Sequence, residues 1–173
     1  MTGSRITRAP GPELRPFVQS VWAIEAPSPQ RGEREHVVPT GQMHLVFRLG
    51  GGDLRLYADA DDPQGRPAGQ ALIGGARDSY YVRTVAGGQL SVGVQLRAGA
   101  AEALFGVPAG EFTNRHTPLE DLWGRQVDTI LDRLASVDSL EDRVSLLESI
   151  LAARVRRTRG VHPAVARALQ RFT

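Results

Sequence analysis

The stretch "QLSVGVQLRAGAAEALFG", residues 89–106, changes its periodicity half-way and thereby decides the fold. Alternate residues from Leu90 to Leu96 are apolar, which places them on one side of an extended strand. After Arg97 the apolar spacing becomes helical, and residues 98–106 predict a short helix that glycine ends. We therefore expect a β part before this point and a helical part after it.

The chain before this switch predicts short strands that are separated by turns. The runs rich in β-branched and aromatic residues are 17–25, two runs within 36–52, 53–58 and two runs within 79–97. Stretches rich in glycine and proline bound these runs, as they bound the strands of all-β proteins. The pattern favours an antiparallel β-barrel or sandwich.

Two β-hairpins are expected within this part. Pro-Thr-Gly at 39–41 separates two apolar runs by the length of a hairpin turn, and Gly87-Gly88 separates the next two. A three-residue turn at 39–41 would place His36 directly opposite His44. Period-2 alternation would then put His36, His44 and Arg48 together on the polar side of the first hairpin.

The chain after the switch predicts two helices. Residues 118–135 carry an apolar stripe, and Pro118 followed by acidic residues suits a helix start. Residues 139–157 carry a second stripe, and Ser139 with Asp142 has the spacing of a capping box. Because the link between them is very short, the two helices must lie antiparallel. The predicted fold class is therefore α+β, a β-barrel or sandwich followed by a helical hairpin.

Composition excludes several classes of protein. The net charge is +2, so charge alone indicates no strong nucleic-acid surface, although all 21 basic residues are arginine. Cysteine is absent, which excludes a disulfide framework and a thiolate zinc site. The sequence shows neither the apolar core of a signal peptide nor an apolar run long enough for a membrane span. We expect a cytoplasmic protein that does not contact the membrane.

The two histidines of the first hairpin are the main candidate for chemistry. Directly opposed positions bring Cβ atoms within about 4.5–5.5 Å, close enough for two imidazoles to share a transition metal. A cupin-type site needs further ligands, and "MHLVFRL" at 43–49 has one histidine and no carboxylate. We therefore predict no metal, and the absence of a nucleophile motif predicts no catalytic residue and no cofactor. A small cupin-like metal-binding enzyme stays an alternative.

The two apolar helix stripes leave two arrangements open. Both stripes can pack on the β part, or part of the hairpin can pair with a second copy of the chain. Trp123 lies beside the first stripe, and tryptophan is a common anchor of interfaces. The residues predicted for a dimer interface are Leu119, Leu122, Trp123, Ile130, Leu147 and Leu151.

Several stretches resemble the N-terminal domain of AraC-type bacterial transcription regulators, in the branch whose sensor domain has no known function. They are "PELRPFVQSVWAIE" (12–25), "HVVPTGQMHLVFRL" (36–49), residues 74–124 and the helical pair that follows. The most specific parts are "VVPTGQMHLVFRL" and "LFGVPAGEF…PLEDLWG", and the resemblance extends from residue 12 to the end of the chain. One departure is Ala98-Gly99, where the family has proline-glycine, and it leaves the start of the short helix open.

The resemblance implies a regulator rather than an enzyme. Such domains are cupin-like barrels that bind a small effector and dimerise through the adjoining helical hairpin. The polar positions inside the barrel would bind the effector, namely His36, His44, Arg48, Tyr81 and Gln95. A homodimer is the expected assembly, and a ligand-free dimerisation scaffold stays a further alternative.

The resemblance also gives an expectation for the C-terminal residues. "HPAVARALQRF" (162–172) resembles the first helix of a helix-turn-helix DNA-binding half, with Val165, Leu169 and Phe172 on one apolar stripe. DNA would then be read by residues beyond Thr173. The predicted parts are a flexible N-terminus (1–11), a sensor domain (12–117), a dimerising hairpin (118–159) and the start of a truncated DNA-binding domain (160–173).

Overall fold

The computed structural model describes residues 3–26, 34–51, 54–84, 88–155 and 167. These residues form two antiparallel sheets and four α-helices, which confirms the predicted α+β class. Within the described ranges the strands form two separate sheets, and they do not close into a single barrel. Apart from Arg167, the helix predicted near the C-terminus lies outside the described residues.

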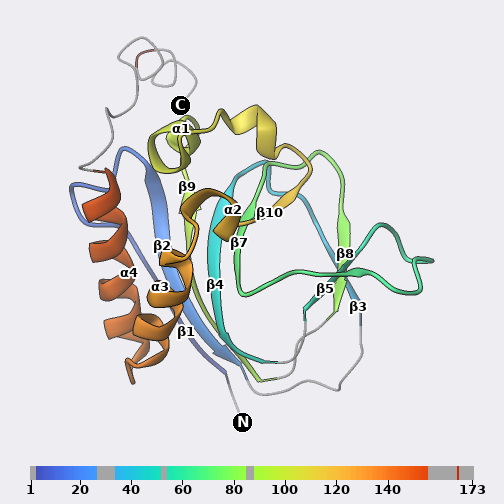
Figure 1. Cartoon of the computed structure of the whole chain (residues 1–173), viewed down its shortest axis with the longest axis horizontal. Helices are drawn as coiled ribbons and strands as arrows, with labels where there is room; N and C mark the ends of the chain where they lie inside the picture. The colour runs from blue at the N-terminus through green and yellow to red at the C-terminus, as the bar shows by residue number, and fades with distance from the viewer. Residues whose placement is uncertain (1–2, 27–33, 52–53, 85–87, 156–166, 168–173) are drawn as a thin grey trace.

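The larger sheet has six strands and the smaller has four (Figure 1). The six-stranded sheet contains, in spatial order, β1 (Ser4–Arg8), β2 (Val18–Ala26), β9 (Gln89–Leu96), β4 (His44–Gly50), β7 (Ala71–Gly74) and β10 (His116–Pro118). The four-stranded sheet contains β3 (Arg34–Val37), β8 (Tyr81–Thr84), β5 (Arg55–Tyr57) and β6 (Arg66–Pro67). Following the described strands in sequence order, the chain passes from one sheet to the other six times.

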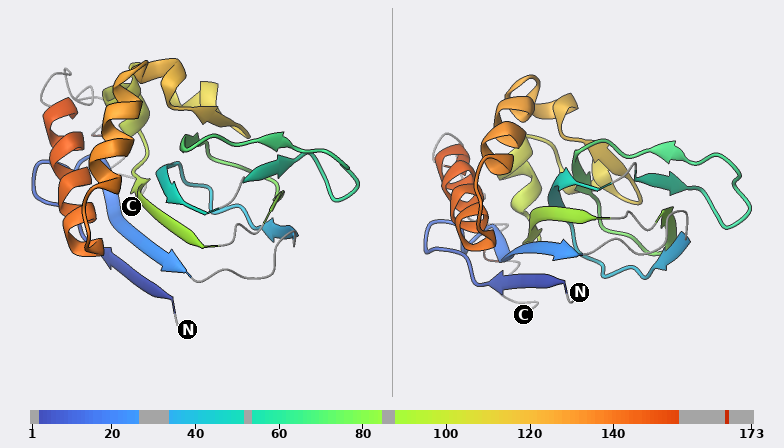
Figure 2. Two further views of the ribbon diagram at one scale, coloured as in Figure 1. Left: turned by 60° about the horizontal axis from the view of Figure 1, so that its bottom comes forward. Right: turned by 90° about the horizontal axis from the view of Figure 1, so that it is seen from below.

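The helices cover the face of the six-stranded sheet that is turned away from the smaller sheet (Figure 2). They are α1 (Ala100–Phe105), α2 (Glu120–Trp123), α3 (Gln126–Ala135) and α4 (Leu140–Val155), with a 3-10 turn at Ala109–Phe112. Leu45 and Phe47 of β4 and Val92 and Val94 of β9 are fully buried in the core beneath them. The alternation predicted for these strands is therefore confirmed, because it marks the side that the helices cover.

Both predicted hairpins are wrong, because each connects strands of different sheets. His36 of β3 pairs with Val82 of β8, whereas His44 of β4 pairs with Gly74 and Gln95 in the larger sheet. Likewise β8 pairs with β3 and β5, while β9 pairs with β2 and β4. The length of a turn limits the distance between the ends of two strands, but it does not determine whether the strands pair. The strands whose alternate side chains are all buried belong to the sheet beneath the helices.

The short helix after the switch is confirmed, and glycine stands at both of its ends. Gly99 precedes α1 with φ 81°, and Gly106 follows it with φ 72°. Both values lie in the left-handed region that glycine adopts without steric cost. The start that the sequence left open is therefore Ala100.

The N-terminal residues differ from the expectation of a flexible segment. β1 pairs antiparallel with β2 along its whole length, from Ser4 opposite Glu25 to Arg8 opposite Val21. Arg8 also forms an ion pair with Glu148 on α4. The alternation in this strand is weak because it is an edge strand with one partly buried side chain, Ile6.

The helical hairpin packs on its own sheet, as in the first of the two arrangements left open by the sequence. Five of the six residues predicted for a dimer interface are buried within the chain, and Leu122 is partly buried against the same core. The stripe of these side chains faces the six-stranded sheet, and the dimer interface itself stays a prediction. The predicted capping box is confirmed: the hydroxyl of Ser139 accepts from the Asp142 N–H at 3.0 Å and donates to its carboxylate at 2.7 Å. Among the described helices, none has the length and apolar character needed to cross a membrane.

Candidate functional site

A row of polar side chains crosses the face of the six-stranded sheet that lies opposite the helices. The strand register places Gln95, His44, Gly74 and His116 next to one another on β9, β4, β7 and β10. Residues paired across neighbouring strands share a face of the sheet. Tyr81 of the smaller sheet contacts His116, with ring centroids 4.6 Å apart, so this row lies between the two sheets.

Glycine at position 74 allows the two histidines to approach each other. A Cβ atom at this position would lie 2.1 Å from Cε1 of His44, a distance that real atoms do not adopt. The imidazole of His44 therefore lies across β7, and its centroid is 6.3 Å from that of His116. Any larger residue at 74 would displace His44 from this position.

Arg77 follows β7 and completes the site. One of its terminal nitrogens, Nη2, donates to Nδ1 of His116 at 2.9 Å, and its guanidinium lies 4.6 Å from the ring centroid of Tyr81. Because an arginine can only donate, Nδ1 of His116 must carry the lone pair and Nε2 the proton. Nε of Arg77 is buried and has no hydrogen-bond partner in the part of the chain that the structure describes. We call His44, Arg77, Tyr81 and His116 the polar cluster.

The surroundings of the polar cluster hold both histidines in the neutral form at pH 7. Burial, with smaller contributions from Arg83 and Arg77, lowers the pKa of His44 to about 4. Burial, followed by the charge of Arg77, lowers the pKa of His116 to about 3. Burial also raises the pKa of Tyr81, so its hydroxyl stays protonated. The cluster therefore presents neutral hydrogen-bonding groups beside the positive charge of Arg77.

The inner side of the smaller sheet carries an ion pair near the polar cluster. Arg83 of β8 donates through Nε to Glu35 of β3 at 2.5 Å. Both residues lie on the same side of the smaller sheet as Tyr81, because Glu35 pairs with Arg83 in register and Tyr81 is two positions along β8. The charge of Arg83 is thus largely balanced within the protein.

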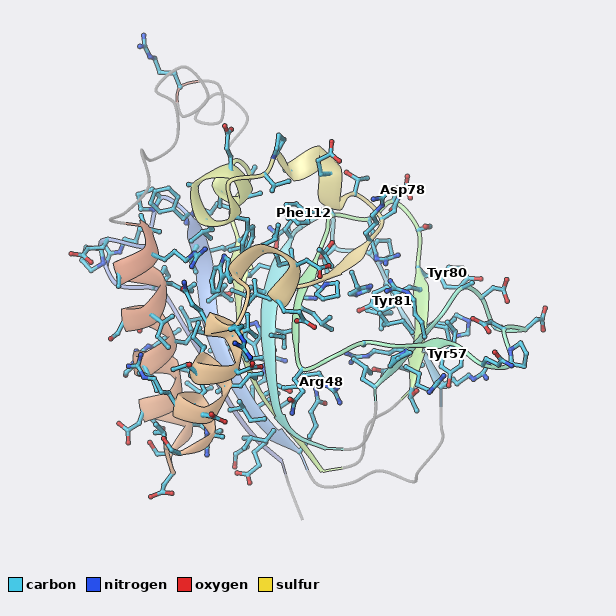
Figure 3. All side chains as sticks on the ribbon, in the orientation of Figure 1. Arg48, Tyr57, Asp78, Tyr80, Tyr81 and Phe112 are labelled. Atoms are coloured by element: carbon cyan, nitrogen blue, oxygen red, sulfur yellow. The ribbon has the colours of Figure 1, made fainter. Side chains whose placement is uncertain are left out.

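The structure brings together three of the five predicted ligand-binding residues. His44 and Gln95 are register neighbours, and Tyr81 reaches the same place from the smaller sheet. Gln95 donates to the carbonyl of Met43 at 3.0 Å, which fixes its side chain. His36 lies on the other side of the smaller sheet, where its ring contacts Tyr80 with centroids 5.0 Å apart. Figure 3 shows Tyr80 and Tyr81 on opposite sides of β8.

Arg48 lies apart from the polar cluster. It is four residues from His44 on β4, and Figure 3 shows it near the opposite end of that strand from Tyr81. Its Nη1 donates to the carbonyl of Gly69 at 3.2 Å. It lines a pocket of about 270 Å³ together with Gly50, Gly51, Leu54, Pro67, Ala68, Gly69 and Gln70. The predicted residue is therefore buried beside a pocket whose lining includes neither His44 nor His116.

The polar cluster does not have the composition of a metal site. Within the described ranges, no group of three or more His, Cys, Asp or Glu side chains is arranged to hold a metal ion. Arg77 already occupies the Nδ1 lone pair of His116, and its positive charge opposes a bound cation. The arrangement suits a ligand that accepts hydrogen bonds.

His116, Arg77 and Gly74 were missed by the sequence analysis. His116 stands two residues before Pro118, in a segment whose signals point to the start of a helix. Its neighbourhood depends on the pairing of β10 with β7, which brings residues 116 and 74 together. The sequence offers one weak signal for His116, which is the small number of histidines. The chain has only four, so testing each of the other three as a neighbour of His44 would have included His116.

The β part of the chain matches a known family model. The family is described as a domain of unknown function, DUF6597, and its model matches residues 6–118. This chain belongs to the DUF6597 family. The DUF6597 match begins in β1 and ends with the last residue of β10, so it includes the whole polar cluster. No curated protein matches the chain.

Proposed function

We propose that this DUF6597 domain is the ligand-sensing part of an AraC-type transcription regulator, and that its two sheets form an open, cupin-like sensor. The sequence resemblance supports the family of regulators. The polar cluster supports ligand binding, since it gathers hydrogen-bonding groups and a positive charge between two sheets. An incompletely satisfied polar group in such a place is typical of a binding site.

The continuity between the polar cluster and the helices carries this proposal. His116 opens β10, which ends at Pro118 and leads through buried Leu119 into α2. Trp123 of α2 contacts Phe105 of α1, with ring centroids 5.9 Å apart. The guanidinium of Arg154, near the end of α4, lies 4.0 Å from the ring centroid of the same tryptophan. A ligand that moves His116 would therefore act on the end of α4 through Trp123.

In this proposal the DNA-binding part follows α4, and the regulator acts as a homodimer. A ligand changes DNA affinity only if it binds two arrangements of the protein with different affinity. The proposed two-state element is the contact of Trp123 with Arg154. The buried residues of the hairpin stripes are used within the chain, so a dimer would use other surfaces of α3 and α4.

The first experiment reads the coding frame beyond Thr173 in the source gene. We expect it to continue into two helix-turn-helix patterns, and a stop codon directly after Thr173 would overturn the DNA-binding part of the proposal. The next experiment measures DNA affinity of the full-length protein by fluorescence anisotropy. Trp123→Leu should change this affinity at least several-fold, because it removes the contact with Arg154. Tyr80→Leu is the matched control, since Tyr80 is exposed on the far side of β8.

A further inference from the structure

We infer that the polar cluster binds a small carboxylic acid in its ionised form, with the carboxylate at Arg77 and an apolar body beside Tyr81. This inference rests on the ligand site of the proposed function, but it does not depend on DNA binding.

Arg77 is a partly buried cation, and its contacts with the described residues leave most of its donors unused. His116 accepts one of the five N–H groups that a guanidinium carries, and Tyr81 contributes only the face of its ring. No ion pair joins Arg77 to a carboxylate among the residues that the structure describes. The Nε atom is buried without an acceptor among the described residues, and a buried donor that has no acceptor is unfavourable. A carboxylate bound by the guanidinium fork would supply two acceptors and an opposite charge.

The charges around the cluster select an anion over a cation or a neutral ligand. Arg66, Arg77 and Arg83 all act on His116 with positive charge. Of these, Arg83 is balanced by Glu35, and the carboxylate of Asp78, whose negative charge acts on Arg77, is exposed to solvent. The two histidines add no charge at pH 7, so the remaining field is positive. An ammonium group or a metal ion would be repelled at this place.

The side chains next to the cluster favour an apolar body on the acid. Leu72 lies two positions before Gly74 on the same face of β7, and Val46 is its partner on β4. Leu72 and its neighbours Leu54, Leu56 and Ala68 are buried, and Val46 and Tyr81 pack against them while staying partly exposed. A bare inorganic anion would contact only the polar groups of the cluster. An aromatic or aliphatic carboxylate can also contact the exposed parts of Val46 and Tyr81.

The test compares four probes against the 173-residue chain by isothermal titration calorimetry and thermal shift. Phenylacetate, phenylacetamide and phenethylamine share one body and differ in charge, and acetate provides the carboxylate without the body. We expect phenylacetate to bind and to raise the melting temperature. Acetate and phenylacetamide should bind at least tenfold more weakly, and phenethylamine should not bind. The ring ¹⁵N signals of His116 should shift with phenylacetate, because its hydrogen-bond partner is the anchor.

Variants of Arg77 separate binding from folding. Arg77→Gln should weaken phenylacetate at least tenfold, and Arg77→Lys should restore only part of the affinity because lysine lacks the planar fork. The melting temperature without ligand shows whether each variant is folded. Arg133→Gln is the control, since Arg133 is an exposed arginine on α3. If Arg77→Gln does not fold, Arg77→Lys and the comparison of phenylacetate with phenylacetamide still test the inference.

Three results would overturn the inference: equal binding of the amide and the acid, binding of the amine, or no binding of any probe. Phenylacetate binding that leaves the DNA affinity of the full-length protein unchanged would overturn the regulatory role and keep the anion site. Ligand-dependent DNA binding with no response to phenylacetate or to Arg77 substitution would overturn the anion site and keep the regulatory role.

Discussion

On β4, Leu45 and Phe47 point toward the helices and are fully buried, whereas His44 and Arg48 at the alternate positions point toward the four-stranded sheet. The helix-facing side of the six-stranded sheet is uniformly apolar and closely packed. The other side carries polar groups and glycine, including Gly74 beneath the ring of His44. The same strands thus provide stability on one face and a site on the other.

The largest expected effect comes from the helix-facing side. Leu45→Ala removes a fully buried side chain and leaves a cavity, which should lower the free energy of unfolding by about 3–4 kcal/mol. Val46→Ala, one position along and on the opposite face, should cost about 1 kcal/mol because Val46 is only partly buried. Chemical denaturation measures both. Equal losses of unfolding free energy in the two variants would show that the two faces of the sheet are packed alike.

The next effect is a pH dependence of stability that arises on the inner face, which is the face of the six-stranded sheet opposite the helices. Unfolded histidines bind protons near pH 6.5, while the folded-state pKa is about 4 for His44 and about 3 for His116. The unfolded state therefore gains protons first, and stability falls as pH decreases from about 6.5 to 4. The loss due to His44 alone should be about 3 kcal/mol. His44→Gln should reduce the slope of this part of the profile and leave the share due to His116, and an unchanged profile would contradict the assignment.

A smaller effect tests the contact between Gly74 and His44. Gly74→Ala should destabilise the protein by about 2 kcal/mol, because the new Cβ atom would overlap the imidazole. In the background of His44→Ala this cost should largely disappear, since the ring that the methyl group displaces is gone. A double-mutant cycle measured by denaturation gives the coupling energy. The same cost in both backgrounds would mean that the methyl group strains the backbone instead.

The smallest effect is expected at the start of α4, which belongs to neither face of the six-stranded sheet. Ser139→Ala removes the acceptor for the Asp142 N–H at the start of α4, which should cost about 1 kcal/mol. Ser139→Asp should retain most of the stability, because a carboxylate also caps a helix start. Since the cap is distant in sequence from the polar cluster, ligand binding should be unchanged. A cap variant that weakens phenylacetate would show that the helices and the inner face are more closely coupled than the comparison implies.

The features that could be predicted from the sequence are those set by neighbouring residues. The change of period after the last strand, the glycine that ends α1 and the capping box at Ser139 all depend on short-range spacing. Alternation also placed His44 and Gln95 on one face, because every second residue of a strand points the same way.

The features that could not be predicted depend on which strands become neighbours. Turn length at 39–41 does not state whether the next strand returns to the same sheet, so the expected pairing of His36 with His44 is wrong. His116 meets His44 only because β7 lies between β4 and β10. The place of Arg77 in the site follows in turn from its hydrogen bond to His116. The centre of the site is therefore a product of sheet order, which no local pattern contains.

The six passages of the chain between the two sheets have a consequence for folding. Because strands of the two sheets alternate along the sequence, neither sheet can assemble completely until its partner's strands have been placed. The pairings are mostly non-local, and non-local pairing slows folding because loop closure precedes the stabilising contacts. The β part should therefore unfold and refold as one slow cooperative unit, and amide exchange should protect strands of both sheets to a similar degree.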